Sequence, residues 1–594
     1  MAEQRYIDRN TRSGKGWISS YYKSRITLFV LASIFPFQWT LALFGGPLYR
    51  NNAGVWPYAI IPLAIAAGYV YILVRSAQCA QAQIDAESRD ARLAAERENN
   101  KTPEQRAAEA AARAEEAAQK RAEMRQQFVG LKIGQSTGML HSRAHVGGVP
   151  QGQHVDLARE DASKNIIIFG GTGGGKTSRS INPLLRQLMM QNAGALIFDI
   201  KTDFAREVQA LCDMTGRTYK VVGDGGMTLN LFRGCSPELA SSYLKSCFLS
   251  DGQGKGDSSF WVNGATEMSR HCLTLLRLLR PEQYSIAGLY DLLFDDNDRA
   301  QLLEDGAARV GEMSDRDQRF FVQSQRYIVN VWNEHDEKVM KGLKSTLDSV
   351  LGPFAHPDMI DAFSAGSEQG EANMTELVND GDVFLVNLPM TKFGREGARF
   401  AYMIIKLRFM DMMRERRTRQ DWNQDRPVAF VCDEYQSIID PISDVDFWDK
   451  SRSTRTIGIV SMQGVASLVN ALGNNKAVAE AILQNFRQRI IFRTEDEATL
   501  RHIRDVLGQV DVHITSAGAS ASESESYSRG GAPGSGSVST SYSASESANT
   551  SIQRQDVFGA NDMRSLSADF CLYIGNVGDR AVDEVLSVKP LYIN

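Results

Sequence analysis

The sequence of 594 residues contains little cysteine, and its seven cysteines are scattered along the chain. No two of them form a C-x-x-C pair, and none lies at the spacing of metal ligands. This pattern excludes a cysteine-based metal site and the disulfide framework of a small secreted protein. We therefore expect reduced, mostly buried thiols in a cytosolic globular region.

A net positive charge is also absent. The formal net charge is −5, while 23% of the residues are charged and 43% are hydrophobic. This composition excludes a protein that coats duplex DNA through a basic surface covering the whole molecule, although a local basic groove or pore remains open. The length is sufficient for three or four domains.

Two stretches near the N-terminus lack charged residues altogether. Residues 26–46 and 55–74 each supply the roughly 20 residues that a helix needs to span a bilayer. A cleaved signal peptide does not explain two successive long runs, and a buried helical hairpin is the other alternative. The 25 residues before the first run contain six Lys or Arg, whereas the link between the runs contains only Arg50. The positive-inside rule then places both ends on the cytoplasmic side.

We therefore predict that residues 1–80 form a two-helix membrane anchor, with the region that follows in the cytoplasm. Residues 81–127 contain no glycine and a single proline, and they are dominated by Ala, Glu, Arg and Gln. This composition favours a charged helical spacer. Large apolar residues at heptad spacing are missing, so we do not predict a coiled coil.

A glycine-rich motif follows the apolar run at residues 165–169. It reads G-G-T-G-G-G-K-T, the pattern of a P-loop, and a predicted helix at residues 178–190 follows it. Glycines let successive backbone N–H groups face phosphate oxygens at a helix N-terminus. Lys176 would reach the β- and γ-phosphates, and the Thr177 hydroxyl would ligate Mg²⁺. The predicted nucleotide-binding residues are Gly170, Gly171, Thr172, Gly173, Gly174, Gly175, Lys176, Thr177 and Ser178.

A second apolar run, residues 427–432, ends in two carboxylates that complete such a site. Asp433 would hold Mg²⁺ through water, and Glu434 would polarise the water that attacks the γ-phosphate. A third run, residues 456–462, ends in Gln463, where a γ-phosphate-sensing side chain belongs. The sequence therefore predicts an enzyme that binds and hydrolyses ATP with Mg²⁺.

Strand and helix patterns alternate around these motifs, which predicts a parallel α/β sheet with ligands at the carboxyl ends of its strands. Further strands are predicted at residues 195–198, 218–222 and 382–389. Residues 236–364 are helical in pattern, for instance at 260–279 and 320–350, and we interpret them as an all-α insertion. Residues 128–235 and 365–594 then form the nucleotide-binding domain.

Serine dominates residues 516–551, where it supplies 14 of 36 residues. The composition favours a disordered loop. Much of the serine recurs at every second position, however, which is the spacing of a strand and leaves an extended hairpin as the alternative.

The order of these features resembles the type IV coupling proteins, the membrane-anchored ATPases of conjugation and type IV secretion. The motifs that carry the resemblance are Gly170 to Thr177, Asp199-Ile200-Lys201, Asn230-Leu231-Phe232, Phe260-Trp261, Asp433-Glu434 and Arg452…Gly458…Gln463. The family commonly has a proline and a Gly-Glu around its Asp-x-Lys, where this chain has Ile200 and Thr202-Asp203.

The resemblance implies a RecA-like homo-hexameric ring on the inner membrane, with the all-α domain facing the cytoplasm and receiving the substrate. ATP sites would lie between subunits, with an arginine inserted in trans. Motif position makes Arg452 the candidate for this arginine, and Arg487, Arg489 and Arg493 are the alternatives. Gln463 would be the sensor.

The leading hypothesis is a coupling ATPase that works with the inner-membrane components of a type IV secretion system. It would feed a relaxase bound to single-stranded DNA, or effector proteins, into the secretion channel. A duplex-DNA translocase of the kind that acts at bacterial division septa is one alternative. A membrane-tethered recruitment platform, whose nucleotide site controls only assembly, is the other.

Overall fold

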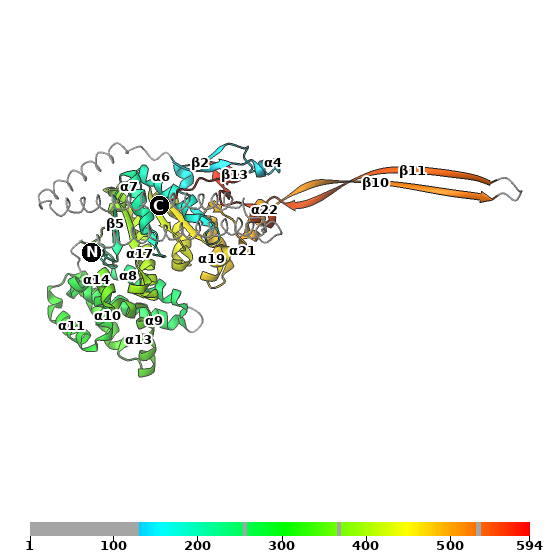
Figure 1. Cartoon of the computed structure of the whole chain (residues 1–594). Coiled ribbons are helices and arrows are strands. Elements are labelled where there is room, and N and C mark those ends of the chain that lie inside the picture. The colour runs from blue at the N-terminus through cyan, green and yellow to red at the C-terminus, as the bar shows by residue number, and fades with distance from the viewer. Residues whose placement is uncertain (1–129, 254–257, 365–369, 530–535, 594) are drawn as a thin grey trace, which may run out of the picture. The chain divides into compact units, whose positions relative to one another are not determined.

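The computed structural model describes residues 130–253, 258–364, 370–529 and 536–593 (Figure 1). The predicted membrane anchor and the charged spacer lie outside these ranges. Among the residues that are described, no helix has both the length and the apolar character needed to cross a membrane.

An eleven-stranded mixed sheet organises the described chain, with the strand order β2-β1-β13-β12-β9-β3-β8-β7-β4-β6-β5. The strands from β9 to β5 in this order pair in parallel, and the remaining pairs are antiparallel. The strands are β1 (Gly130–Ser136), β2 (His154–Ala158), β3 (Ile166–Phe169), β4 (Gly194–Asp199), β5 (Tyr219–Gly223), β6 (Val383–Asn387), β7 (Val428–Cys432), β8 (Thr456–Met462), β9 (Gln488–Ile491), β12 (Phe570–Val577) and β13 (Arg580–Ser587).

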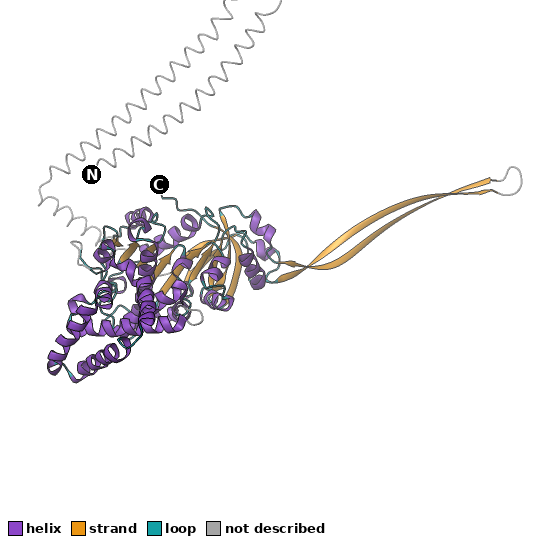
Figure 2. Ribbon diagram, turned by 90° about the horizontal axis from the view of Figure 1, so that it is seen from below, coloured by secondary structure: helices purple, strands orange, loops and turns teal. Residues whose placement is uncertain are grey.

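The central strands are buried on both faces, which explains their continuous apolar sequences. Every residue of β3, β4, β7 and β8 is buried. Alternate residues point to opposite sides, so Ile167 and Phe169 enter one hydrophobic cluster while Ile166 and Ile168 enter another. Figure 2 shows the strands side by side with helices around them.

Helices cover the sheet and connect its strands. Those that belong to the α/β part are α4 (Met139–Ser142), α5 (Arg159–Ala162), α6 (Asn182–Met190), α7 (Ala205–Thr215), α15 (Glu376–Asn379), α16 (Met390–Phe393), α17 (Arg395–Arg416), α18 (Ser443–Lys450), α19 (Val465–Ala471), α20 (Lys476–Asn485), α21 (Glu497–Leu507) and α22 (Ala560–Ser565). The helix after the P-loop opens with one π-helical turn, Thr177–Ile181, before it continues as α6.

The described part of residues 236–364 contains helices and no strand. These helices are α8 (Pro237–Phe248), α9 (Ser258–Leu279), α10 (Ile286–Phe294), α11 (Asp296–Arg309), α12 (Asp315–Tyr327), α13 (Glu337–Leu351) and α14 (Pro357–Phe363). The helical pattern at residues 320–350 belongs to two helices, because a short non-helical stretch separates Trp332 from Glu337. Asp336 caps the second helix by accepting a hydrogen bond from the Val339 N–H at 2.8 Å.

The serine-rich segment forms the hairpin and not the disordered loop that its composition favoured. β10 (Gln509–Arg529) and β11 (Gly536–Asp556) pair antiparallel as a separate two-stranded sheet, drawn in orange in Figure 1. The register sets serines opposite one another, and the hydroxyls of Ser522 and Ser543 lie 2.8 Å apart. Hydrogen bonds between such facing hydroxyls stabilise an antiparallel pair.

A buried ion pair joins α17 to α18. Lys406 and Asp444 have side chains that are 0% exposed, and the Lys406 Nζ lies 2.8 Å from Asp444 Oδ2. The Lys406 ammonium also donates to the Ile438 carbonyl, and Asp444 accepts from the Asp440 N–H. Burial raises the pKa of Asp444, although the charge of Lys406 opposes this shift.

Replacing Lys406 should destabilise the fold strongly. In Lys406→Met the carboxylate of Asp444 keeps its burial and loses its counter-ion, which typically costs about 3–5 kcal/mol. Denaturant titration followed by tryptophan fluorescence should show the loss as a lower unfolding midpoint. The double variant Lys406→Met/Asp444→Leu removes both charges and should recover most of it. A single variant as stable as the parent would contradict the role of this pair.

Candidate nucleotide-binding site

The loop between β3 and its following helix has a backbone that requires glycine. Gly173 and Gly175 adopt φ angles of +74° and +90°, in the left-handed region that side chains rarely occupy. A Cβ on Gly170 would lie 2.9 Å from the Cβ of Phe492, the residue that directly follows β9, the strand next to β3. The predicted P-loop therefore has a tight turn that is closed against the sheet on one side.

Lys176 lies inside this loop. It is 7% exposed, and its Nζ donates to the carbonyls of Gly170 at 2.7 Å and Gly171 at 3.3 Å. Burial lowers the pKa of Lys176, and the nearby charge of Lys201 lowers it further, while Asp433 raises it. The ammonium group of Lys176 therefore lies beside the backbone N–H groups of the loop, an arrangement suited to phosphate binding.

The predicted carboxylates face the loop from the end of β7. β8 separates β3 from β7, and the parallel register pairs Phe169 with Met462 and Cys432 with Val460. The same register places Ser461 beside Asp433, and the Ser461 hydroxyl donates to Asp433 Oδ1. Glu434 follows in the left-handed conformation, with a φ of 59°.

Lys201 binds both carboxylates. Its Nζ lies 3.0 Å from Asp433 Oδ2 and 2.7 Å from Glu434 Oε1. Burial lowers the pKa of Lys201, but Glu434 and Asp433 together raise it above its ordinary value. Gln436 donates its amide to the second oxygen of Glu434. Glu434 is therefore oriented by two neighbours.

The oxygen donors at this edge fit Mg²⁺. Thr177 offers a hydroxyl at the start of the helix, and Asp433 offers a carboxylate that Ser461 and Lys201 already orient. The described residues contain no group of three or more His, Cys, Asp or Glu side chains that could hold a metal by themselves. Mg²⁺ commonly takes only one or two protein ligands and completes its shell with water and substrate phosphates.

The other predicted residues lie at opposite ends of the parallel strands. We call the side formed by the carboxyl ends of these strands the P-loop edge, and the side formed by their amino ends the far edge. Gln463 follows β8 and is exposed at the edge where the P-loop lies. Arg452 precedes β8, in the turn Ser451–Thr454, and is exposed at the far edge. It therefore lies away from the nucleotide site of its own chain.

The three alternative arginines lie at different positions relative to β9. Arg487 precedes β9 at the far edge, where its N–H donates to the Lys164 carbonyl. Arg489 donates to the Leu483 carbonyl at 3.0 Å, and burial lowers its pKa. Arg493 follows β9 and is exposed at the P-loop edge, where its carbonyl accepts from the Gly171 N–H.

Two residues that contact Asp433 have no role that the sequence alone predicts. Lys201 belongs to the Asp199-Ile200-Lys201 motif, and Ser461 lies within the apolar run at residues 456–462. The strand order carries the missing information, because both residues reach Asp433 from strands that are distant in sequence. An Asp-x-Lys at the end of one buried strand and an Asp-Glu at the end of another were the available signals for Lys201.

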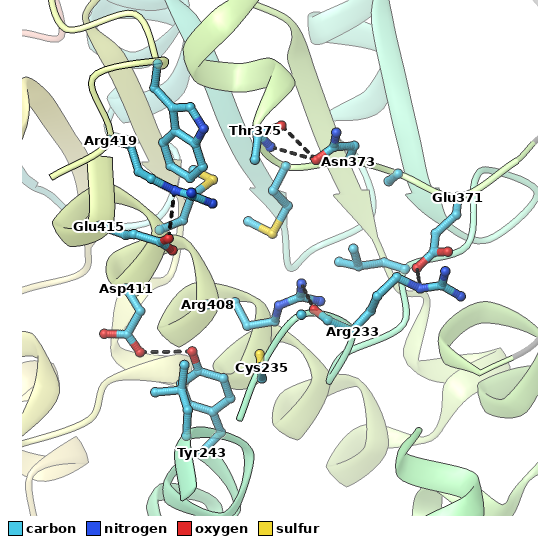
Figure 3. Close-up of a pocket in the computed structure, with 17 residues that line it drawn as sticks. Arg233, Cys235, Tyr243, Glu371, Asn373, Thr375, Arg408, Asp411, Glu415 and Arg419 are labelled. Carbon is cyan, nitrogen blue, oxygen red and sulfur yellow. Dashed lines mark hydrogen bonds and ion pairs between the residues drawn. The ribbon is translucent and has the colours of Figure 1, made fainter. Parts of the chain in front are cut away.

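A separate cavity of about 420 Å³ lies where α8 and α17 meet residues 371–375 (Figure 3). Polar and charged side chains that line it bind one another. Tyr243 donates to Asp411 at 2.9 Å, and Arg233 lies 2.8 Å from Glu371. The hydrogen bond from Tyr243 to Asp411 joins the helical region to the α/β part, which favours a structural junction over a second nucleotide site.

Two family models match the chain. Residues 144–331 match the DNA-binding domain of the type IV secretion-system coupling protein, and residues 427–567 match the TraM recognition site of TraD and TraG. The chain belongs to the type IV coupling proteins. This confirms the resemblance found in the sequence and, with it, the coupling role in conjugative transfer that defines the family. No curated protein sequence matches this coupling protein.

Several solved structures are similar to this chain at low sequence identity. The plasmid coupling protein TrwB in complex with ADP and Mg²⁺ is 15% identical, with a TM-score of 0.49, over 79% of this coupling protein and 95% of TrwB. VirB4 of Thermoanaerobacter pseudethanolicus is 14% identical, with a TM-score of 0.37, over 64% of this chain and 89% of VirB4.

Removing the Ser461 hydroxyl should weaken Mg²⁺ binding. Residues that orient a metal ligand typically contribute about 10–100-fold to metal affinity, and Ser461 orients Asp433. Mg²⁺ titration of the ADP-bound Ser461→Ala variant should show at least a tenfold loss, with metal-free ADP binding unchanged. Ser453→Ala removes an exposed hydroxyl at the far edge and is the matched control. Equal Mg²⁺ affinity in the two variants would contradict the role of Ser461.

Proposed function

We propose that this coupling protein hydrolyses ATP and uses the energy to move cargo into a type IV secretion channel. The observation that supports this most directly is the meeting of Lys176, Asp433 and Glu434 at one edge of the sheet. A platform that only binds nucleotide would not need a positioned carboxylate such as Glu434.

Each side chain of the site has a separate role in the proposed hydrolysis. The loop N–H groups and Lys176 would bind the β- and γ-phosphates, and Thr177 and Asp433 would hold Mg²⁺, which would neutralise charge on the phosphates. Glu434 takes the proton from the attacking water. Gln436 keeps Glu434 in place through a hydrogen bond. Lys201 lies close enough to Glu434 to offset the negative charge of its carboxylate.

The position of Arg452 supports assembly of several chains into a ring. Its place at the far edge suits a RecA-like ring in which each chain inserts an arginine into the site of the next, and such arginines contribute about 10³–10⁵ in rate. Gln463 would report the γ-phosphate within each chain. The anchor at residues 1–80 would fix a homo-hexamer to the inner membrane beside the secretion components, so that the helical region faces the cytoplasm.

Single-stranded DNA carried by a relaxase is the cargo that we propose. The family model that matches residues 144–331 describes a DNA-binding domain, and it spans the P-loop and the first helices of the helical region. Effector proteins are the alternative cargo, because the formal net charge of the full sequence is −5, which excludes a basic surface covering the whole molecule.

Glu434→Gln should bind ATP and turn it over at least a hundredfold more slowly, because the amide cannot accept the proton from water. Fluorescent-nucleotide binding and phosphate release would measure the two steps separately. Lys176→Ala, as the companion variant, should lose binding, hydrolysis and conjugative transfer together. Normal turnover in Glu434→Gln would remove this residue from its role, and normal transfer in Lys176→Ala would reject the motor.

The ATPase rate should rise at least severalfold when single-stranded DNA is added, and native mass spectrometry should show a six-subunit ring. The matched comparison is duplex DNA of the same length and sequence. A greater response to the duplex would favour the septal type of translocase. A rate indifferent to both would favour protein cargo.

A further inference from the structure

The last described segment, residues 588–593, passes beside the P-loop helix. β13 pairs antiparallel with β12, and Ser587 lies opposite Phe570. β12 in turn pairs antiparallel with β9, so β13 ends at the edge of the sheet where the P-loop lies. The Leu591 N–H donates to the Ser178 carbonyl at 2.8 Å. The segment is thus attached to the residue that directly follows Thr177.

Arg179 holds the next residue of this segment in place. Its Nη2 donates to the Tyr592 hydroxyl at 2.9 Å and to Asp569 Oδ1 at 3.0 Å. The guanidinium carbon lies 5.7 Å from the centroid of the Tyr592 ring. Gly175 packs against the same guanidinium, since a Cβ there would lie 2.9 Å from Arg179 Nη1. The phosphate loop, Arg179 and Tyr592 therefore form one contiguous surface.

The Tyr592 ring is nevertheless open to solvent, with 61% of the residue exposed. Its hydroxyl is fixed by Arg179, while the ring is not covered by the core. An aromatic ring that is held at its polar end and largely exposed to solvent is suited to stacking on another flat ring.

The strand order determines the side on which a nucleoside would lie. Lys201, Asp433 and Gln463 come from β4, β7 and β8, which all lie on one side of β3. The γ-phosphate must point toward these groups, because they act on it. The opposite end of the nucleotide must therefore extend to the other side of β3, toward β9 and β12. Asp569, Arg179 and Tyr592 lie on that side.

We propose that Tyr592 forms one wall of the base-binding site and stacks on the nucleobase of the bound nucleoside triphosphate. Arg179 is the positioning residue that holds the ring. This inference rests on the proposed ATPase function and extends it to the base. Stacking uses the π-face that every base has, so the wall contributes affinity for the base without selecting a particular one.

The test compares ligands with and without a base on the full chain in detergent, by isothermal titration calorimetry with ADP and with inorganic tripolyphosphate. Base–aromatic stacking is worth about 1–3 kcal/mol, so Tyr592→Ala should bind ADP about tenfold more weakly. Binding of tripolyphosphate should be unchanged. Tyr592→Phe keeps the ring and should retain ADP affinity within about twofold. Tyr542→Ala removes another exposed tyrosine, on the β10–β11 hairpin, and is the control.

The remaining outcomes separate this inference from the function on which it rests. ADP affinity unchanged in Tyr592→Ala would overturn the stacking wall and leave the ATPase function intact. Equal losses for ADP and tripolyphosphate would show that the segment only supports the P-loop, which also overturns the wall. A parent chain that binds neither ligand would reject the nucleotide site itself.

Discussion

The parallel pairing of β3, β8 and β7 is the constraint on which the site depends. It brings the ends of three buried strands to one edge, where backbone N–H groups, an ammonium group and two carboxylates meet. The strands are buried on both faces, so their register is fixed by two hydrophobic clusters at once. A shift by one residue would move Ser461 away from Asp433 and turn apolar side chains to the wrong face.

Helices packed on the same sheet hold the residues at its strand ends in place. α17 packs within the larger hydrophobic cluster and carries Lys406, whose buried ion pair fixes the segment that follows Glu434. Tyr402 on α17 donates to the carbonyl of Asp199, at the end of β4. The residues that hold Lys201 and Glu434 are therefore supported by one long helix, which also contacts α8 of the helical region.

Local patterns predicted much of this arrangement. The buried strands read as apolar runs, and the P-loop and the Asp433-Glu434 pair follow from residue chemistry at strand ends. The partners of these groups did not follow, because Lys201, Ser461 and Gln436 acquire meaning only when strand order is known. The hairpin was misjudged because serine is typical of disorder, whereas its spacing of two carried the correct signal.

The β10–β11 hairpin has a thermodynamic consequence of its own. Its strands pair with each other as a separate sheet, and an isolated two-stranded ribbon is marginally stable in water. Its opening and closing are therefore set by local hydrogen bonds and not by the hydrophobic core. A ligand that stabilises the eleven-stranded sheet slows amide exchange there through linkage. The ribbon would keep its own exchange rate, so the eleven-stranded sheet and the ribbon have separate free energies of opening.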